Sequence, residues 1–379
     1  MIAPRFGVYI HWPYCTRLCP YCDFNIYRAR GRDAGPLLDA IVADLEGHRG
    51  RLGRRSVETL FLGGGTPSLL SGADVARIIG AVDRVFGLAG DAEITLESNP
   101  EDRARFADHA AAGVNRFSIG VQSLEDAALH ALGRAHDAAS AVAAVEAAHA
   151  TGQRVSLDLI YAREGQGVDA WAGELRAALS LPAEHLSLYQ LTIEPGTAFA
   201  RAVARQRLSQ PGDDLAADLY EATQTLCATS GAPAYEISNH ARGAAARARH
   251  NLLYWTGGDW LGVGPGAHGR VAPGGARTAT KAHDRPDDYA NAVLSNGVGW
   301  ESAVALAPSE VAEEAVLMGL RLTDGLVRAP VEALRGMPLD AAAIARFQAA
   351  GLLVDDGARL RLTDAGRLLG DHIAKTLAQ

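Results

Sequence analysis

The sequence is poor in cysteine, and this scarcity excludes a fold that depends on disulfide bonds. Only four cysteines occur in 379 residues, too few to stabilise so long a chain as a disulfide framework. Three of them crowd into eight residues as Cys15, Cys19 and Cys22, whereas Cys227 stands alone. A tight group of thiols without a disulfide framework indicates a metal site in a reducing compartment.

The sequence also lacks any run that approaches the roughly 20 apolar residues of a membrane span. Its first stretch, MIAPRFGVYIHWPYC, has no basic flank followed by a long apolar run. We therefore expect a cytoplasmic protein and leave peripheral membrane contact through an amphipathic face open. Acids and bases are mixed along the chain, with a formal charge of -8, so the basic footprint of a nucleic-acid-binding protein is missing. Proteins and small molecules are the expected partners.

Short β-rich runs alternate with longer helical patterns over the first half of the chain. Because parallel neighbours need crossover connections, this alternation predicts a parallel sheet or a partial (β/α) barrel. Polar and glycine-rich residues follow the strands, where barrels carry their chemistry. The predicted strands are GVYIHW, VETLFLGGG, EITLES, NRFSIGVQ, VSLDLIYA and HLSLYQL, and the predicted helices span 36–49, 74–87, 101–112, 137–151 and 168–179.

The pattern changes after the last of these strands. An amphipathic helix is predicted near 212–230, followed by the glycine-rich, aromatic stretch HNLLYWTGGDWLGVGPGAHG. From Pro308 onward the patterns read helix, helix, strand and helix, an order typical of a winged helix. This segment has no basic cluster, which favours a packing or interaction role over nucleic-acid binding. We predict three parts, residues 1–205, 206–305 and 306–379.

Cys15, Cys19 and Cys22 form a C-x3-C-x2-C pattern directly after the first predicted strand. Three thiolates suit a cubane iron–sulfur cluster, because they leave one of the four irons open to another ligand. A zinc site is the alternative, although structural zinc usually takes four ligands from paired motifs and the sequence has no second pair. A plain iron–sulfur electron carrier also stays open on this evidence.

The run CTRLCPYC, with the preceding YIHWPYC and the later GGGTPS, resembles the radical S-adenosylmethionine (SAM) superfamily. The resemblance implies an α/β fold, a partial (β/α)6 barrel with a C-terminal α+β region ending in a winged-helix-like module. It also implies a [4Fe-4S] cluster on the three cysteines, with SAM on the open iron. Within the superfamily the chain resembles the coproporphyrinogen III dehydrogenase-like branch, whose SAM contacts match Tyr9, Gly64, Gly65, Thr66, Glu97, Gln122, Arg134 and Asp158. Arg134 suits the carboxylate of SAM, because a guanidinium binds carboxylates bidentately.

Two groups within that branch differ in function. One is the dehydrogenase, an enzyme that decarboxylates coproporphyrinogen III, and the other consists of heme chaperones that deliver heme to client hemoproteins such as respiratory cytochromes. The dehydrogenase has a further cysteine where this chain has Phe24, and a longer arm before its first cluster ligand. The run HNLLYW matches a signature of the chaperones. The resemblance therefore favours a heme chaperone, with the dehydrogenase as the alternative, and it leaves homodimer formation open.

The chaperone resemblance makes His250, Tyr254 and Trp255 the candidate heme-binding residues. An imidazole can ligate iron, and the two aromatic rings supply flat apolar area with polar edges. From the residues alone, a packed helix edge is the commoner role of such a run. Cys227 and His268 are secondary candidates, for which a buried structural cysteine and a turn histidine are favoured.

One stretch departs from the pattern of the family. Ala162 follows the run Asp158-Leu-Ile-Tyr, where the family has glycine and then a turn with proline. Alanine lacks the conformational freedom of glycine, so we expect the loop after this strand to differ.

Overall fold

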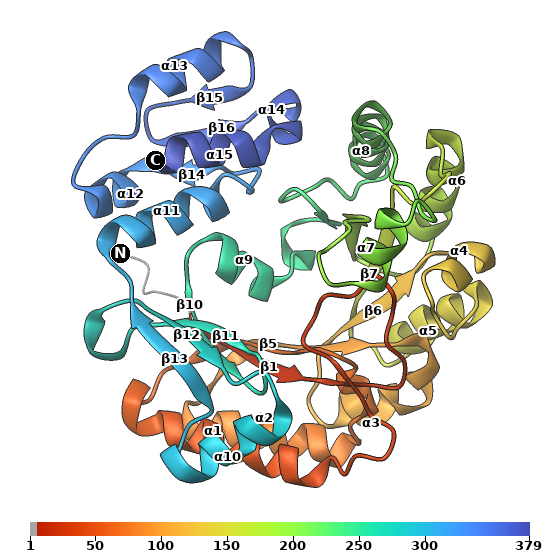
Figure 1. The fold of residues 1–379 in the computed structure, drawn as a ribbon, viewed down its shortest axis with the longest axis vertical. Coiled ribbons are helices and arrows are strands. Elements are labelled where there is room, and N and C mark those ends of the chain that lie inside the picture. Colours follow the sequence, from red (N-terminus) through yellow and green to blue (C-terminus); the bar gives the residue numbers. More distant parts are fainter. Residues whose placement is uncertain (1–5) are drawn as a thin grey trace.

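The structure is a computed structural model that describes residues 6–379. Residues 1–5, which begin the first predicted part of the chain, lie outside the described residues. Within the described part, an 11-stranded sheet has the order β13-β12-β11-β10-β1-β4-β5-β6-β7-β8-β9 (Figure 1). Its strands are β1 (Phe6–Trp12), β4 (Val57–Gly64), β5 (Leu88–Ser98), β6 (Arg116–Gln122), β7 (Arg154–Tyr161), β8 (His185–Gln190), β9 (Asn239–Ala241), β10 (Asp259–Val263), β11 (His268–Val271), β12 (Thr278–Ala282) and β13 (Trp300–Ala305).

Six strands of this sheet, β1 and β4 to β8, follow one another in chain order and pair in parallel. Helices connect most of them, as parallel pairing requires. Strand β1 is almost continuously buried, as expected for a parallel strand covered on both faces. The predicted partial (β/α)6 barrel is therefore confirmed. Its helices are α1 (Gly35–Leu52), α2 (Gly72–Val85), α3 (Phe106–Ala111), α4 (Asp126–Ala131), α5 (Ala138–Ala150) and α6 (Val168–Leu179).

Most predicted elements coincide with observed ones. The predicted helix 101–112 begins instead as a 3-10 helix, η2 (Pro100–Arg105), and continues as α3. Pro100 at its start has no N–H to donate. The helix expected near 212–230 is α8 (Asp213–Thr229), which follows the short α7 (Ala198–Ala204).

The region after α8 joins the same sheet. Strand β10 pairs in parallel with β1, and β11, β12 and β13 extend the sheet by antiparallel pairing. Helix α9 (Arg249–Trp255), which carries the HNLLYW run, precedes β10. Helix α10 (Pro286–Asn296) packs beside α1 below the sheet in Figure 1. One sheet thus contains strands from both of the parts predicted as 1–205 and 206–305. The division between these two parts stays a prediction.

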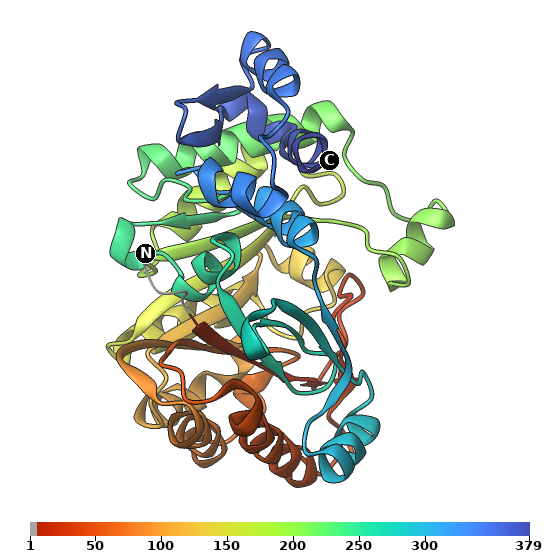
Figure 2. The same ribbon diagram turned by 90° about the vertical axis from the view of Figure 1, so that its left-hand side faces the viewer.

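The C-terminal module has its own hydrophobic core. In both views it lies at the opposite end of the molecule from α1, α2 and α10 (Figure 1, Figure 2). Its order of elements is typical of a winged helix. The sequence patterns did not indicate the short elements β14, α12 and β15, and the predicted last helix is divided into α14 and α15. The module comprises α11 (Pro308–Gly319), β14 (Leu326–Val327), α12 (Arg328–Arg335), α13 (Ala341–Ala349), β15 (Leu353–Asp355), β16 (Arg359–Leu362), α14 (Asp364–Leu368) and α15 (Gly370–Ala378).

Ion pairs join this module to the rest of the chain. Arg270 of β11 makes a two-pronged contact with Glu314 of α11, with N–O distances of 2.8 and 2.9 Å. Arg321 pairs with the buried Glu236 at 3.1 Å, and its guanidinium lies 4.6 Å from the ring centre of Trp255. No helix among residues 6–379 combines the length and apolar character needed to cross a bilayer.

Candidate functional site

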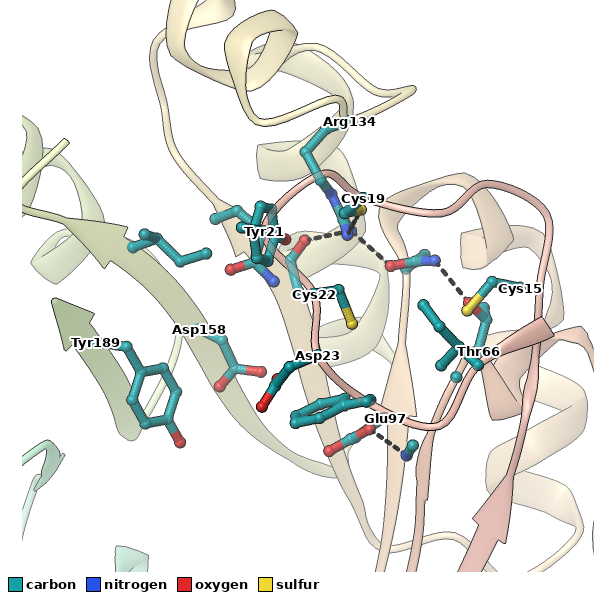
Figure 3. Close-up of a pocket in the computed structure, with 18 of the residues that line it drawn as sticks. Cys15, Cys19, Tyr21, Cys22, Asp23, Thr66, Glu97, Arg134, Asp158 and Tyr189 are labelled. Atoms are coloured by element: carbon teal, nitrogen blue, oxygen red, sulfur yellow. Dashed lines mark hydrogen bonds between the residues drawn. The ribbon is translucent and has the colours of Figure 1, made fainter. Parts of the chain in front are cut away.

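A pocket of about 400 Å³ opens at the carboxyl ends of the parallel strands. The volume is within the usual range of small-molecule sites. One wall is the cysteine loop, which we define as residues 15–28. The two-residue strands β2 (Tyr14–Cys15) and β3 (Tyr27–Arg28) pair at its two ends. Figure 3 shows the three cysteines of this loop around the pocket, with Asp158 and Tyr189 on the side away from Cys15.

Cys15, Cys19 and Cys22 all line this pocket. Cys15 is buried, and the other two are half-buried. Burial, together with the nearby sulfurs of Cys19 and Cys15, raises the pKa of the Cys22 thiol to about 11. Burial also raises the pKa of Cys15. Cys15 and Cys22 therefore resist ionisation in the absence of a cation. Three sulfur donors in one pocket are suited to an iron–sulfur cluster, whose irons bind thiolates.

The same donor set has no fourth member. Among the described residues, no group of three or more His, Cys, Asp or Glu side chains is already arranged to hold a single metal ion. Cys227 is fully buried in the main hydrophobic core, and burial raises its pKa to about 12. It is therefore a structural cysteine away from the pocket, as the sequence favoured.

We define the glycine run as residues 63–66. It packs against the residues that lead into the cysteine loop. The N–H of Gly65 donates to the carbonyl oxygen of Trp12 at 2.7 Å, and that of Thr66 donates to Tyr14 at 2.9 Å. A Cβ atom on Gly65 would lie 2.8 Å from the carbonyl oxygen of Trp12, and Gly64 has a φ of +104°. Glycine is needed at both positions, for close approach at one and for backbone conformation at the other.

A hydrogen-bond network links the strand ends behind the glycine run. The amide of Asn99 donates to Thr66 Oγ1 at 3.2 Å and accepts a bond from Arg134 at 2.6 Å. Arg134 also approaches Cys19 Sγ at 3.5 Å. Its Nε is buried and has no hydrogen-bond partner among the described residues. The network therefore holds the guanidinium of Arg134 beside Cys19 and leaves its Nε–H group free to donate a further hydrogen bond.

Two carboxyl groups face the pocket from strands on either side of β6. Glu97 of β5 accepts a bond from the N–H of Gly64, and Asp158 of β7 accepts one from Ser118 at 3.2 Å. Burial raises the pKa of Glu97 to about 7, and the nearby Asp158 adds to this effect. Burial raises the pKa of Asp158 to about 6. Acids with raised pKa values in a pocket mark it as a candidate functional site.

The structure brings ten of the predicted residues into this one pocket. Gln122 joins them at the end of β6, where its φ of +65° is unusual for a residue other than glycine. Sequence reasoning assigned no role to Tyr21, Ser118 and Tyr189, which also line the pocket. Tyr189 lies near the end of the predicted strand HLSLYQL, and this position was a usable signal. The predicted residues that line the pocket are Cys15, Cys19, Cys22, Gly64, Gly65, Thr66, Glu97, Gln122, Arg134 and Asp158.

Tyr9, His250 and Tyr254 line a second cavity of about 300 Å³ inside the barrel. Glu97 and Asp158 border both cavities, so the second lies behind the first. Tyr9 is thus adjacent to the predicted SAM contacts without lining their pocket.

Helix α9 closes the inner side of this second cavity. His250 is 1% exposed and stacks on Phe61 with 5.1 Å between ring centres. Its Nδ1 lies 2.8 Å from Thr59 Oγ1, and its Nε2 lies 2.7 Å from the hydroxyl of Tyr254. Burial lowers the pKa of this imidazole to about 3. His250 is therefore a neutral ring with both nitrogens hydrogen-bonded.

The remaining heme candidates lie apart from one another. Trp255 stacks with the guanidinium of Arg321 from the C-terminal module. His268 is exposed at the start of β11. The structure therefore gathers the predicted SAM and cluster residues, and of the heme candidates it joins only His250 and Tyr254.

The family models match most of the chain. A model described as the radical SAM superfamily matches residues 9–175, and one described as the HemN C-terminal domain matches residues 306–369. The mouse protein named radical S-adenosyl methionine domain-containing protein 1, mitochondrial, is 41% identical over 86% of this chain and 75% of its own length. The Mycobacterium tuberculosis protein named heme chaperone HemW is 39% identical over 100% of this chain and 96% of its own length.

A solved structure supports the same fold. Coproporphyrinogen III oxidase (HemN) from Escherichia coli, described as a radical SAM enzyme, aligns with a TM-score of 0.83. The alignment covers 99% of this chain and 90% of that one at 24% identity, so it bears on the fold alone. The family models and the identity to HemW over nearly the whole chain lead to one assignment. The chain belongs to the radical SAM superfamily and, within its coproporphyrinogen III dehydrogenase-like branch, to the HemW family.

Proposed function

We propose that this protein is a heme chaperone that binds heme and passes it to client hemoproteins such as respiratory cytochromes. The observation that carries the proposal is the identity to a protein named heme chaperone HemW over the full length of this chain. Phe24 lies in the cysteine loop and lines the pocket, at the position where the resemblance places a further cysteine in the dehydrogenase. This difference supports the chaperone over the enzyme.

Membership of the radical SAM superfamily implies a [4Fe-4S] cluster and SAM. We propose that Cys15, Cys19 and Cys22 hold the cluster, because these thiols line one pocket beside the glycine run. When bound, the cluster and SAM supply one-electron chemistry at the open iron. The proposed SAM contacts are Tyr9, Gly64, Gly65, Thr66, Glu97, Gln122, Arg134 and Asp158.

The chain's own groups have distinct parts in that site. Arg134 is held by Asn99 and the carbonyl oxygen of Gly120, which fixes a cation for the carboxylate of SAM. Because its pKa is about 7, Glu97 holds a proton on a large fraction of molecules near neutral pH. A protonated carboxyl group can donate a hydrogen bond to a ribose oxygen as well as accept one.

The heme site proposed from the resemblance is α9, with His250, Tyr254 and Trp255. A neutral imidazole is the form that binds iron, and burial keeps His250 neutral. Ligation through Nε2 requires the hydroxyl of Tyr254 to move away first. A cytoplasmic location, a homodimer and peripheral membrane contact stay predictions of the same proposal.

The test is anaerobic reconstitution with iron and sulfide, followed by heme titration and a coproporphyrinogen III turnover assay on the same sample. Saturable heme binding without turnover is the expected result. Turnover of coproporphyrinogen III with weak heme binding would instead identify the dehydrogenase and would remove α9 as a heme site.

A further inference from the structure

The turn between β10 and β11 lies directly against the cysteine loop. We define this glycine turn as residues 264–267, the GPGA of the LGVGPGAHG stretch. Asn25, three residues after Cys22, donates both of its amide hydrogens outside its own loop. One bond reaches the carbonyl oxygen of Pro265 at 2.9 Å, and the other reaches that of Asp284 at 2.7 Å. A side chain of the cysteine loop thus joins two segments about 240 and 260 residues away in the chain.

The backbone around Asn25 is held as well. Its carbonyl oxygen lies 2.9 Å from Nε2 of His11, a residue of β1. The hydroxyl of Tyr27 donates to the same carbonyl oxygen of Asp284 at 3.1 Å. This end of the loop is therefore fixed from the barrel on one side and from the β10–β12 region on the other.

The sequence of the glycine turn is explained by this contact. Gly266 has a φ of +78°, and a Cβ atom on it would lie 2.5 Å from Nδ2 of Asn25. Gly264 has a φ of +104°, and a Cβ atom there would lie 2.3 Å from the carbonyl oxygen of His11. Side chains at these positions would displace Asn25 or the end of β1. The turn can therefore contact the cysteine loop in this way only if both positions are glycine.

The two ends of the cysteine loop are thus positioned by different means. Cys15 belongs to β2, and the N–H of Ala29 donates to its carbonyl oxygen at 2.8 Å. Cys22 belongs to no strand or helix, and its N–H makes one turn bond, to the carbonyl oxygen of Cys19 at 3.3 Å. Ordering an irregular segment costs conformational entropy. The bonds of Asn25 offset that cost for the segment that carries Cys22.

We propose that Asn25 is a positioning residue for the cluster and that the glycine turn provides the surface against which Asn25 packs. The inference rests on the proposed function in that it takes Cys22 as a cluster ligand. Asn25 touches neither cluster nor SAM in this role. Asn25 links the segment that carries the third thiol to Pro265 and Asp284, which follow the barrel in the chain.

The experiment compares two glycine substitutions, one in each of the two turns that flank β11. Gly266→Ala introduces the clash with Asn25. Gly274→Ala is the matched control, because Gly274 also has a positive φ, of +70°, but a Cβ atom on it would meet nothing within 4 Å. Asn25→Ala removes the amide, and Asn25→Asp keeps its shape while losing both donors. Circular dichroism and thermal unfolding of each variant show whether it folds.

Each variant is reconstituted anaerobically, and the cluster absorbance is followed after an iron chelator is added. We expect the cluster to be lost about thirtyfold faster in Gly266→Ala and in both Asn25 variants, given about 1 kcal/mol for each of the two lost hydrogen bonds. We expect the wild-type rate in Gly274→Ala. The electron paramagnetic resonance spectrum of the reduced cluster should also respond less to added SAM in the Asn25 variants. Wild-type chelation rates and SAM responses in both Asn25 variants would overturn the inference.

Hydrogen exchange of the apo chain separates this inference from the proposed function. In Asn25→Ala we expect faster exchange over residues 22–28 and unchanged exchange in β4 to β8. Failure of the wild-type chain to take up iron contradicts the proposed function alone, and the exchange measurement then decides on Asn25 by itself. Unchanged exchange over residues 22–28 counts against the positioning role whatever the chain binds.

Discussion

The backbone N–H of Gly64 donates a hydrogen bond of 2.9 Å to Oε2 of Glu97. This bond joins the end of β4 to the end of β5 at the floor of the cofactor pocket. It favours the ionised form of Glu97, yet burial outweighs it and raises the pKa to about 7. The site therefore keeps a carboxyl group that costs stability when it is ionised.

This cost predicts how stability depends on pH. Between pH 4.5, the ordinary pKa of a glutamate, and about 7 the folded chain binds a proton at Glu97 that the unfolded chain has released. The contribution of Glu97 to stability therefore falls as pH rises through this window and is fully unfavourable above it. Glu97→Gln should stabilise the apo chain by about 3 kcal/mol at pH 8 and by little at pH 4. Denaturant unfolding at both pH values measures this, with the exposed Glu146→Gln as control. Equal gains at both pH values would contradict the prediction.

A second prediction concerns the three proposed cluster ligands. Serine at position 15, 19 or 22 replaces a soft thiolate by a hydroxyl that binds iron poorly. We expect each of Cys15→Ser, Cys19→Ser and Cys22→Ser to lower bound iron at least tenfold after reconstitution. Cys227→Ala is the control, since Cys227 is buried in the core; it should keep full iron content and lose about 1 kcal/mol of stability. Iron and sulfide analysis decides, and a fall in iron in Cys227→Ala equal to that in the other three would show that a general loss of folding is responsible.

Ala162 gives a third prediction. The residue has a φ of +57°, in the left-handed region that costs an alanine about 1 to 2 kcal/mol. The loop thus keeps a glycine-like backbone without a glycine. Ala162→Gly relieves this strain but loses a buried methyl group and adds freedom to the unfolded chain, about 1.5 kcal/mol together. We expect a net change within about 0.5 kcal/mol. Ala144→Gly, at a buried position inside α5, should lose about 2 kcal/mol. Similar losses in both variants would show that Ala162 is unstrained.

The sequence predicted those features that short-range patterns encode. The six strands are runs of apolar and β-branched residues, and the three cysteines fall directly after the first of them, so both the barrel and the place of the cysteine loop could be predicted. The place of β10 could not, because its parallel pairing with β1 joins residues about 250 positions apart. Strand β14 has two residues, too few for any periodicity. The contact of Asn25 with the glycine turn likewise depends on the assembled sheet.

The surroundings of the heme candidate His250 could not be predicted from the sequence either. A resemblance can match His250 to a heme signature, but no sequence pattern shows that Thr59 and Tyr254 occupy both of its nitrogens. The burial of the ring follows from where α9 lies against β4 and β1. The role of His250 is therefore a question for measurement, and the structure supplies a discriminating pair of variants.

Our last prediction uses that pair. If His250 ligates heme through Nε2, the hydroxyl of Tyr254 competes with the iron for the same nitrogen. Tyr254→Phe frees Nε2 and should tighten heme binding about fivefold, because one hydrogen bond worth about 1 kcal/mol no longer has to be broken. His250→Ala removes the ligand and should weaken heme binding at least tenfold. The exposed His268→Ala is the control and should bind heme as the wild type does. Opposite shifts in the two variants, measured by heme titration of folded protein, identify α9 as the heme site. Equal, unchanged affinities in both would mean that α9 closes the barrel and that heme binds elsewhere.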